Sequence, residues 1–186
     1  MGKEYTDINS GLQKWISKQH LFFVSTAPSA ADGLINCSPK GLDCLRVLGP
    51  HELAYADTGG SGIETLAHLK DNGRITLMMC AFEGPPKIYR FYGTGTPVEP
   101  HEAKFDALAG EFESMPAIRN IIVIKVERII DSCGYGVPMY SFEKHRDSLG
   151  NYLAKQSDAD ILEYRRTRNS RSLEGLEGLT PPSPAD

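Results

Sequence analysis

Residues 45–56 read Leu-Arg-Val-Leu-Gly-Pro-His-Glu-Leu-Ala-Tyr-Ala, two short apolar runs separated by the turn-forming pair Gly49-Pro50. Short apolar runs that stop at a turn signal are typical of β-strands. A connection this short can only join neighbouring strands in antiparallel fashion. The stretch therefore predicts a β-hairpin.

A second hairpin is expected over residues 21–37. Residues 21–26 form an apolar run, the Asp32-Gly33 pair supplies a turn signal, and residues 34–37 form the expected return strand. Two consecutive hairpins indicate a fold built mainly from antiparallel strands.

The rest of the chain extends this pattern. Further strands are expected at the apolar runs 74–79, 87–93 and 121–126, and helices at about 9–19, 61–72 and 102–112. Most connections are too short for the crossover helices of a parallel sheet. The pattern predicts a mainly β fold with helices (α+β), an antiparallel barrel with a few helices at its ends.

A chain of 186 residues is long enough for one core. We expect a barrel domain over residues 1–146 that includes the N-terminal helix. A polar helical extension is expected over residues 147–178. Residues 147–166 within it could form one helix. The proline-rich residues 179–186 are expected to be a disordered tail.

Composition excludes several classes of function. A formal net charge of −4 argues against broad nucleic-acid binding. No apolar run approaches the roughly 18 residues of a membrane-spanning helix, and no secretory signal is visible. The four cysteines and five histidines show no metal-ligand spacing. A cytoplasmic protein with free thiols and no metal site is expected.

The first candidate site is Ser38-Pro39-Lys40, interpreted as a turn at the end of a strand. A hydroxyl group and a mobile lysine charge could bind an oxyanion. An ordinary polar loop is the alternative.

The second candidate is the glycine-rich stretch 59–65, which precedes a helix. Free N–H groups at a helix N-terminus can bind a phosphate, with Ser61 or Thr65 contributing a hydroxyl group. Ser61 and Glu64 also have the spacing of a capping box, in which both side chains serve the helix itself. The two interpretations can coexist if Glu64 folds back.

Arg46 is the third candidate, because an arginine in an apolar strand must reach solvent, a carboxylate or a ligand. Arg90 has the same ambiguity. No Ser-His-Asp or paired-carboxylate arrangement can be argued from the chain.

Together these segments resemble the pyridoxamine 5′-phosphate oxidase-like FMN-binding split-barrel family, and most closely its oxidase-related members. The matching stretches are residues 22–27, 38–41, 46–48, 55–62, 64–69, 72–77, 82–86 and 132–138. The resemblance implies a six-stranded antiparallel Greek-key barrel that forms a homodimer and holds FMN in clefts between the subunits.

The resemblance also implies roles for particular residues. The strand residues Arg46, Val47 and Leu48 would lie along the flavin ring, and the backbone of Tyr55 and Ala56 would meet its edge. The phosphate would lie near the hydroxyl groups and the lysine of both candidate loops, that is, near Ser38, Lys40, Ser61 and Thr65. Cys133 and Tyr135 could cover the ring from the neighbouring subunit or could simply be buried in a hairpin.

The chain also departs from the oxidase. Glu64-Thr65 stands where the oxidase has Arg-Lys in its phosphate loop, and the C-terminal substrate elements have no counterpart. The resemblance therefore implies an FMN-dependent oxidoreductase of unknown substrate, and the departures count against pyridoxamine 5′-phosphate oxidation itself. The alternative is a non-catalytic barrel that binds or senses a flavin, a deazaflavin or haem.

Overall fold

The structure, a computed structural model, describes residues 2–181. Its strands are β1 (Glu4–Tyr5), β2 (Phe22–Thr26), β3 (Asn36–Lys40), β4 (Leu45–Gly49), β5 (Glu52–Thr58), β6 (Arg74–Cys80), β7 (Ile88–Val98) and β8 (Ile118–Ser132). Its helices are α1 (Ser10–Ile16), α2 (Glu64–Asn72), α3 (Phe105–Ala109), the short 3₁₀ helix Gly110–Phe112, α4 (Ser148–Leu153) and α5 (Asp158–Arg168). None of the helices within residues 2–181 is long and apolar enough to cross a membrane.

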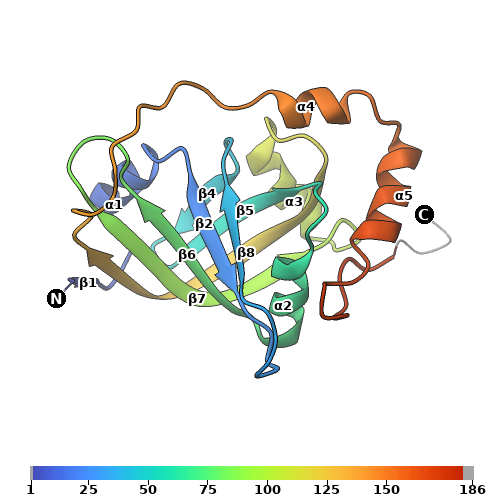
Figure 1. The fold of residues 1–186 in the computed structure, drawn as a ribbon, viewed down its shortest axis with the longest axis horizontal. Coiled ribbons are helices and arrows are strands. Elements are labelled where there is room, and N and C mark those ends of the chain that lie inside the picture. The colour runs from blue at the N-terminus through green and yellow to red at the C-terminus, as the bar shows by residue number, and fades with distance from the viewer. Residues whose placement is uncertain (1, 182–186) are drawn as a thin grey trace.

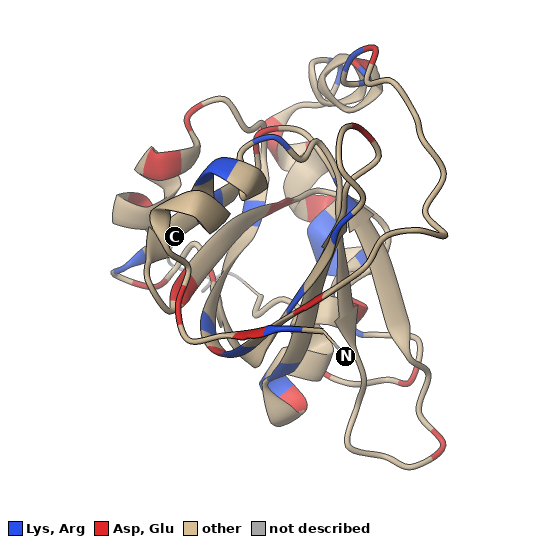
Figure 2. Cartoon of the chain, turned by 90° about the vertical axis from the view of Figure 1, so that its left-hand side faces the viewer, with Lys and Arg blue, Asp and Glu red and all other residues tan. Residues whose placement is uncertain are grey.

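The strands form one curled antiparallel sheet in the order β3-β2-β6-β7-β8-β5-β4, with β1 paired to β8 (Figures 1 and 2). Strands β5 to β8 have a Greek-key order, because β5 returns to lie beside β8. The edge strands β3 and β4 do not pair with each other anywhere in the described chain. The expected antiparallel split barrel is confirmed.

The strand number differs from the expected six, since the sheet has eight strands. The additional β1 contains only Glu4 and Tyr5, which is too short to produce an apolar pattern. Strands β7 and β8 also extend well beyond the apolar runs expected for them. Exposed Lys125 and Glu127 alternate with buried residues along β8, so an apolar run marks only the centre of that strand.

Ser38, Pro39 and Lys40 lie in strand β3, so their interpretation as a turn was wrong. They pair with Val24, Phe23 and Phe22 of β2. Pro39 is tolerated because β3 is an edge strand, in which the N–H group of every second residue points away from the sheet. The expected strand also began too early. Leu34 and Ile35 belong to the preceding loop and are 57% and 80% exposed.

The expected capping box at the start of α2 is absent. The helix begins at Glu64, its N-cap residue is Ile63, and no side chain caps it. The expected C-terminal end is confirmed, because Gly73 follows the helix with a φ of 72° in the left-handed region.

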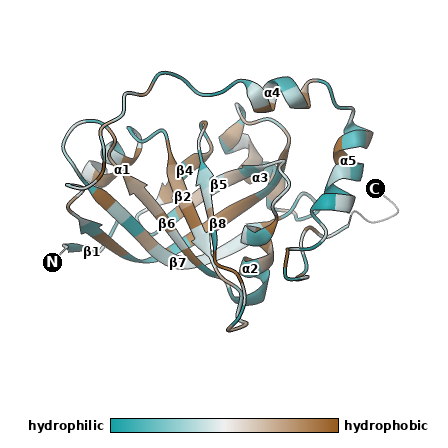
Figure 3. Cartoon of the chain, viewed as in Figure 1, coloured by the Kyte–Doolittle hydropathy of each residue, from teal (hydrophilic) through white to brown (hydrophobic). Residues whose placement is uncertain are grey.

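The core fills the space enclosed by the sheet. Val24, Leu53, Tyr55, Phe91 and Ile122 are completely buried there. Figure 3 shows the apolar residues concentrated on the strands, whereas α5 and the chain that follows it are mainly hydrophilic. The barrel therefore holds the hydrophobic core, and the C-terminal extension packs on its outside.

The C-terminal extension contains two helices instead of the single helix considered for residues 147–166. The break falls before Ser157, which begins α5 with a capping box to Asp160. Farther on, Leu179 is buried against Ile63 and Leu66. This contact lies inside the segment expected to be a disordered tail, of which residues 182–186 are outside the described residues.

Candidate cofactor site at the open seam of the barrel

A cluster of polar side chains bridges the open seam between β3 and β5. We call it the polar seam and define it by Asn36, Ser38, Lys40, Asp57, Thr65, Arg119 and Asn120. Strand β4 pairs with β5 only as far as Tyr55. Asp57 lies beyond that point, so its carboxylate is open to the Lys40 side chain from the opposite edge strand.

Asp57 is the centre of the polar seam. Its side chain is 3% exposed and accepts from Lys40 Nζ at 2.6 Å, Arg119 Nε at 3.0 Å and Asn120 Nδ2 at 3.3 Å. Burial acts to raise the pKa of this carboxyl group, but the charges and hydrogen bonds of Lys40 and Arg119 outweigh it and lower the pKa below its ordinary value. Asp57 is therefore a buried, charged and fully paired carboxylate.

Arg119 also fixes the glycine-rich loop before α2. One terminal nitrogen donates to the Gly60 carbonyl at 2.8 Å, and the other donates to the Gly62 carbonyl at 2.6 Å. The side-chain amide of Asn169, from the C-terminal extension, donates to the same Gly60 carbonyl at 2.9 Å. Ser61 lies between the two anchored carbonyls, so the loop that carries it is held from both sides.

A chain of hydrogen bonds connects β3 to α2. The Asn36 amide nitrogen donates to Thr65 Oγ1 at 2.9 Å, and Ser38 Oγ donates to Asn36 Oδ1 at 2.9 Å. Thr26 Oγ1 lies 3.0 Å from Nδ1 of the buried His68, which belongs to the same helix as Thr65. These contacts bring Ser38 and Thr65 to one place.

The start of α2 has the features of an anion site. No side chain occupies the N–H groups of its first turn, and added Cβ atoms at Gly59 and Gly60 would meet nothing within 4 Å. The backbone at these two glycines is therefore open to approach by a ligand. One residue opposes an anion, because the Glu64 carboxylate lies close to Gly62. With Lys40 and Arg119 nearby, the residues present fit a phosphate group.

Tyr55 and Ala56 lie on β5, directly before Asp57. Tyr55 is completely buried, and burial raises the pKa of its phenol well above the ordinary value. The Ala56 N–H group donates to the Cys44 carbonyl at 2.9 Å, so this donor is already used within the chain. The buried Asn120 Oδ1 accepts no hydrogen bond from the described residues. The seam thus contains an orphaned polar atom next to the fully paired Asp57.

The side chain of Arg46 is used within the protein. Its two terminal nitrogens each lie 2.8 Å from one carboxylate oxygen of Asp43, and Nε donates to the Glu111 carbonyl at 2.8 Å. The guanidinium also lies 5.1 Å from the centre of the Phe112 ring. An arginine in an apolar strand was expected to reach solvent, a carboxylate or a ligand. In this structure Arg46 reaches the carboxylate of Asp43. Val47 and Leu48 follow it on the edge strand β4, where Leu48 is exposed.

Other candidates lie away from the seam. Arg90 donates to Ser132 Oγ at 2.8 Å. Cys133 is exposed, and Tyr135 is 84% exposed, so the buried-hairpin interpretation is wrong for both. Within residues 2–181, no group of three His, Cys, Asp or Glu side chains is placed to hold a metal ion.

Sequence reasoning missed Arg119 and Asn120, and it assigned no role to Asp57. Arg119 and Asn120 precede the apolar run used to predict the last strand, and both are buried. A buried charge normally has a partner. Asp57 and Arg119 each flank an apolar strand run. The presence of two opposite charges at such positions was therefore the sequence signal that could have indicated the ion pair.

A curled antiparallel sheet with Greek-key order, closed at its seam by polar side chains, defines a split-barrel protein. The chain matches the family model described as pyridoxamine 5′-phosphate oxidase over residues 8–133. It is 35% identical over 192 residues to the pyridoxamine 5′-phosphate oxidase family protein ustO of Aspergillus flavus, covering 94% of this chain and 77% of that protein. The chain belongs to the pyridoxamine 5′-phosphate oxidase family.

Two solved structures show the same fold. HupZ from Group A Streptococcus has a TM-score of 0.57 and 24% identity, covering 73% of this chain and 99% of that chain. A putative pyridoxamine 5′-phosphate oxidase from Lactobacillus delbrueckii has a TM-score of 0.51 and 13% identity, covering 68% of this chain and 98% of that chain.

Proposed function

We propose that this protein binds FMN and acts as a flavin-dependent oxidoreductase of its family. The phosphate would lie at the start of α2, near Ser38, Lys40, Ser61 and Thr65. The isoalloxazine ring would lie along Arg46, Val47 and Leu48, with its edge at the backbone of Tyr55 and Ala56. Bound flavin supplies the electron or hydride transfer.

One observation carries this proposal: two cations, Lys40 and Arg119, share one buried carboxylate beside an uncapped helix N-terminus. Two positive charges and one negative charge leave the cluster with a net charge of +1. Lys40 is the more accessible cation, since its side chain is 20% exposed and that of Arg119 is 5% exposed. Lys40 can therefore turn toward a phosphate while Arg119 keeps Asp57 paired.

The chain's own residues bind and orient rather than transfer protons. Asp57 is fully paired, so the polar seam offers no free carboxylate as a general base. Lys40 and the N–H groups of α2 would hold the phosphate, and the β4–β5 hairpin would set the position of the ring. The substrate is not defined by these residues.

A second candidate is a barrel that binds FMN, a deazaflavin or haem without turnover. The missing counterparts of the oxidase's C-terminal substrate elements favour it, and the Glu64 carboxylate beside the phosphate loop opposes tight binding of a phosphate in either candidate. The absorbance spectrum of the freshly purified protein separates flavin from haem. A two-banded flavin spectrum supports flavin binding, which both candidates include, and a Soret band points to haem; reduction of the bound flavin by a substrate then separates the enzyme from the binder. Colourless protein that FMN cannot reconstitute would contradict both FMN hypotheses.

Lys40→Ala should weaken FMN binding by about 1.5–3 kcal/mol, the range for a hydrogen bond to a charged group. That loss is roughly a 10-fold to 150-fold rise in Kd. Titration of FMN-free protein followed by flavin fluorescence measures it. Lys125→Ala removes an exposed lysine of β8 outside the seam and is the matched control. Equal Kd values for Lys40→Ala and the unmutated protein would remove Lys40 from the site.

We also propose a homodimer with the FMN cleft at its interface. The apolar side chains of Tyr135 and Met139, 84% and 78% exposed, support burial against a second subunit. If the cleft is shared, FMN release should track dimer dissociation on dilution. Sedimentation and flavin fluorescence measured on the same dilution series test this. Tight FMN binding by a monomer is the contradicting result.

A further inference from the structure

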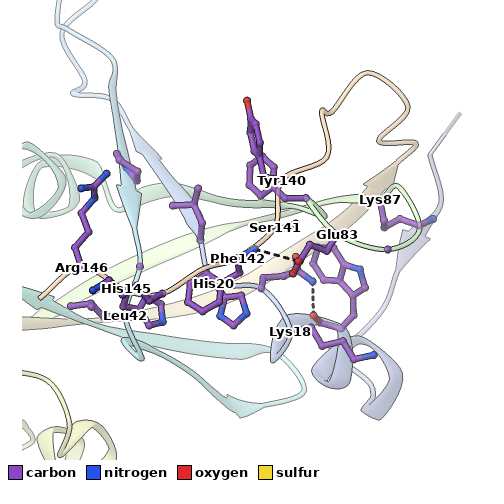
Figure 4. Close-up of a pocket in the computed structure, with 18 of the residues that line it drawn as sticks. Lys18, His20, Leu42, Glu83, Lys87, Tyr140, Ser141, Phe142, His145 and Arg146 are labelled. Atoms are coloured by element: carbon purple, nitrogen blue, oxygen red, sulfur yellow. Dashed lines mark hydrogen bonds between the residues drawn. The ribbon is translucent and has the colours of Figure 1, made fainter.

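A large hollow lies beside the end of β3, where Pro39, Gly41 and Leu42 line it. It is a cleft of about 1300 Å³ between the α1–β2 corner, the loop that joins β6 to β7, and residues 140–149 (Figure 4). The family match ends at residue 133, so one wall of this cleft is built by chain outside the matched domain. The cleft therefore combines residues of the shared domain, including Pro39 and Gly41 on either side of Lys40, with a wall that the family match does not cover.

Aromatic rings form much of its wall. The rings of His20 and Phe142 are stacked, with centroids 3.6 Å apart and planes inclined by 13°. His145 meets Phe142 edge-on at 4.9 Å, and these three labelled side chains lie next to one another in Figure 4. Trp15 and Tyr89 contribute another aromatic pair at 4.7 Å. Flat, apolar walls of this kind suit an aromatic ligand.

The charged residues that line the cleft are mostly basic. Four are cations, Lys18, Lys87, Lys144 and Arg146, and one is an anion, Glu83. Lys87 is paired with Asp131, and Lys144 lies 3.6 Å from Asp147. Lys18 and Arg146 form no ion pair within residues 2–181.

Glu83 is already engaged, because its carboxylate accepts from the Phe142 N–H group at 3.3 Å. The exposed side chains of Lys18 and Arg146 lie at opposite ends of the cleft, and Arg146 is the one beside His145 (Figure 4). An anionic group next to Arg146 can remain partly hydrated. An apolar wall with a cation at this end matches a ligand that has an apolar body and an anionic end.

We propose that this cleft binds a small aromatic carboxylate, with the ring system against His20 and Phe142 and the carboxylate facing Arg146. Arginine is suited to this role because its planar guanidinium can hold a carboxylate through two parallel hydrogen bonds. The volume exceeds the 300–1,000 Å³ or so of ordinary small-molecule pockets, which favours a ligand of more than one ring. Binding at this cleft does not depend on FMN.

The cleft also extends toward the expected position of the flavin. Leu42 lines it and directly precedes Asp43, which holds Arg46 of strand β4. A carboxylate bound here would have its ring system near the β4 edge. That such a carboxylate is the substrate of the flavin rests on the proposed function, whereas its binding to the cleft does not.

The test uses 2-naphthoate and its neutral counterpart 2-naphthamide, titrated by calorimetry into the full chain with and without FMN. We expect 2-naphthoate to bind at least about tenfold more tightly than the amide. The variant Arg146→Gln should weaken binding of 2-naphthoate about tenfold, as for loss of a charge-assisted hydrogen bond. Arg128→Gln, at an exposed position of β8, should leave its Kd unchanged.

Trp15 supplies a second readout because it is the only tryptophan of the chain and lines the cleft. In an NMR titration, its single indole N–H resonance should shift as 2-naphthoate is added. The shifts should give the same Kd as calorimetry. Equal affinity for the acid and the amide, no binding of either, or an unchanged Kd in the Arg146→Gln variant would overturn the proposal. So would competition by FMN that places 2-naphthoate at the polar seam. Binding of 2-naphthoate to a protein that takes no FMN would refute the proposed function alone.

Discussion

Replacing Asp57 by Asn should lower the free energy of unfolding by about 3–5 kcal/mol, the cost of breaking a buried ion pair by removing one partner. The side chain of Arg119 is 5% exposed and cannot turn into water when the carboxylate is lost. Its bonds to the Gly60 and Gly62 carbonyls remain, but carbonyl groups do not neutralise its charge. Lys40 is more exposed and can recover solvation, so most of the loss comes from Arg119.

The difference between Asp57→Asn and the unmutated protein should depend on pH. The pKa of Asp57 is lower in the folded chain than in the unfolded chain, where an aspartate has a pKa of about 3.9. Its contribution to stability is therefore fully present well above that value and is lost as the pH falls through the folded-state pKa. The two proteins should become more alike under acid conditions and differ most near neutral pH.

Urea unfolding at several pH values measures both effects. Asp32→Asn is the matched control, because Asp32 is exposed in the β2–β3 loop and its replacement should leave the free energy of unfolding nearly unchanged. A pH-independent difference for Asp57→Asn, or one as small as that of the control, would show that Asp57 is not the buried charge that holds the seam.

The sequence predicted the strands well but the seam only in part. Lys40 and Thr65 stand out as polar residues at the boundaries of regular elements. Their arrangement around Asp57 depends on the pairing of β5 with β8, which places Asn120 opposite Asp57. That pairing joins strands far apart in the chain, and local apolar patterns carry no information on which distant strand becomes a neighbour.

The capping box failed for a related reason. Ser61 and Glu64 have the local spacing of a helix start, but Arg119 holds the Gly60 and Gly62 carbonyls, and the helix begins only at Glu64. A contact from β8 therefore overrides the local preference. The turn expected at Pro39 failed because the same residue is also compatible with an edge strand, and the position of β3 at the sheet edge is a property of the whole topology.

Arg119→Ala should lower the free energy of unfolding by about 3–5 kcal/mol and should weaken FMN binding more than Lys40→Ala does. The substitution leaves Asp57, 3% exposed, with Lys40 as its single cationic partner. It also releases the Gly60 and Gly62 carbonyls, so the loop before α2 loses its anchor on the barrel. A phosphate site made of backbone N–H groups binds well only while those groups are held in place.

Amide hydrogen exchange separates the two effects of Arg119→Ala, because it can be measured under conditions where the variant remains folded. Exchange should rise in the first turn of α2 and in residues 59–63, and it should stay slow in the centre of β7. Arg128→Ala, on the same strand, is the matched control, since Arg128 and its partner Glu4 are both 61% exposed and such surface pairs contribute little. If exchange before α2 is unchanged while FMN binding falls, Arg119 acts by its charge and not by holding the loop. If FMN binding is unchanged in a folded Arg119→Ala protein, the phosphate does not lie at the polar seam.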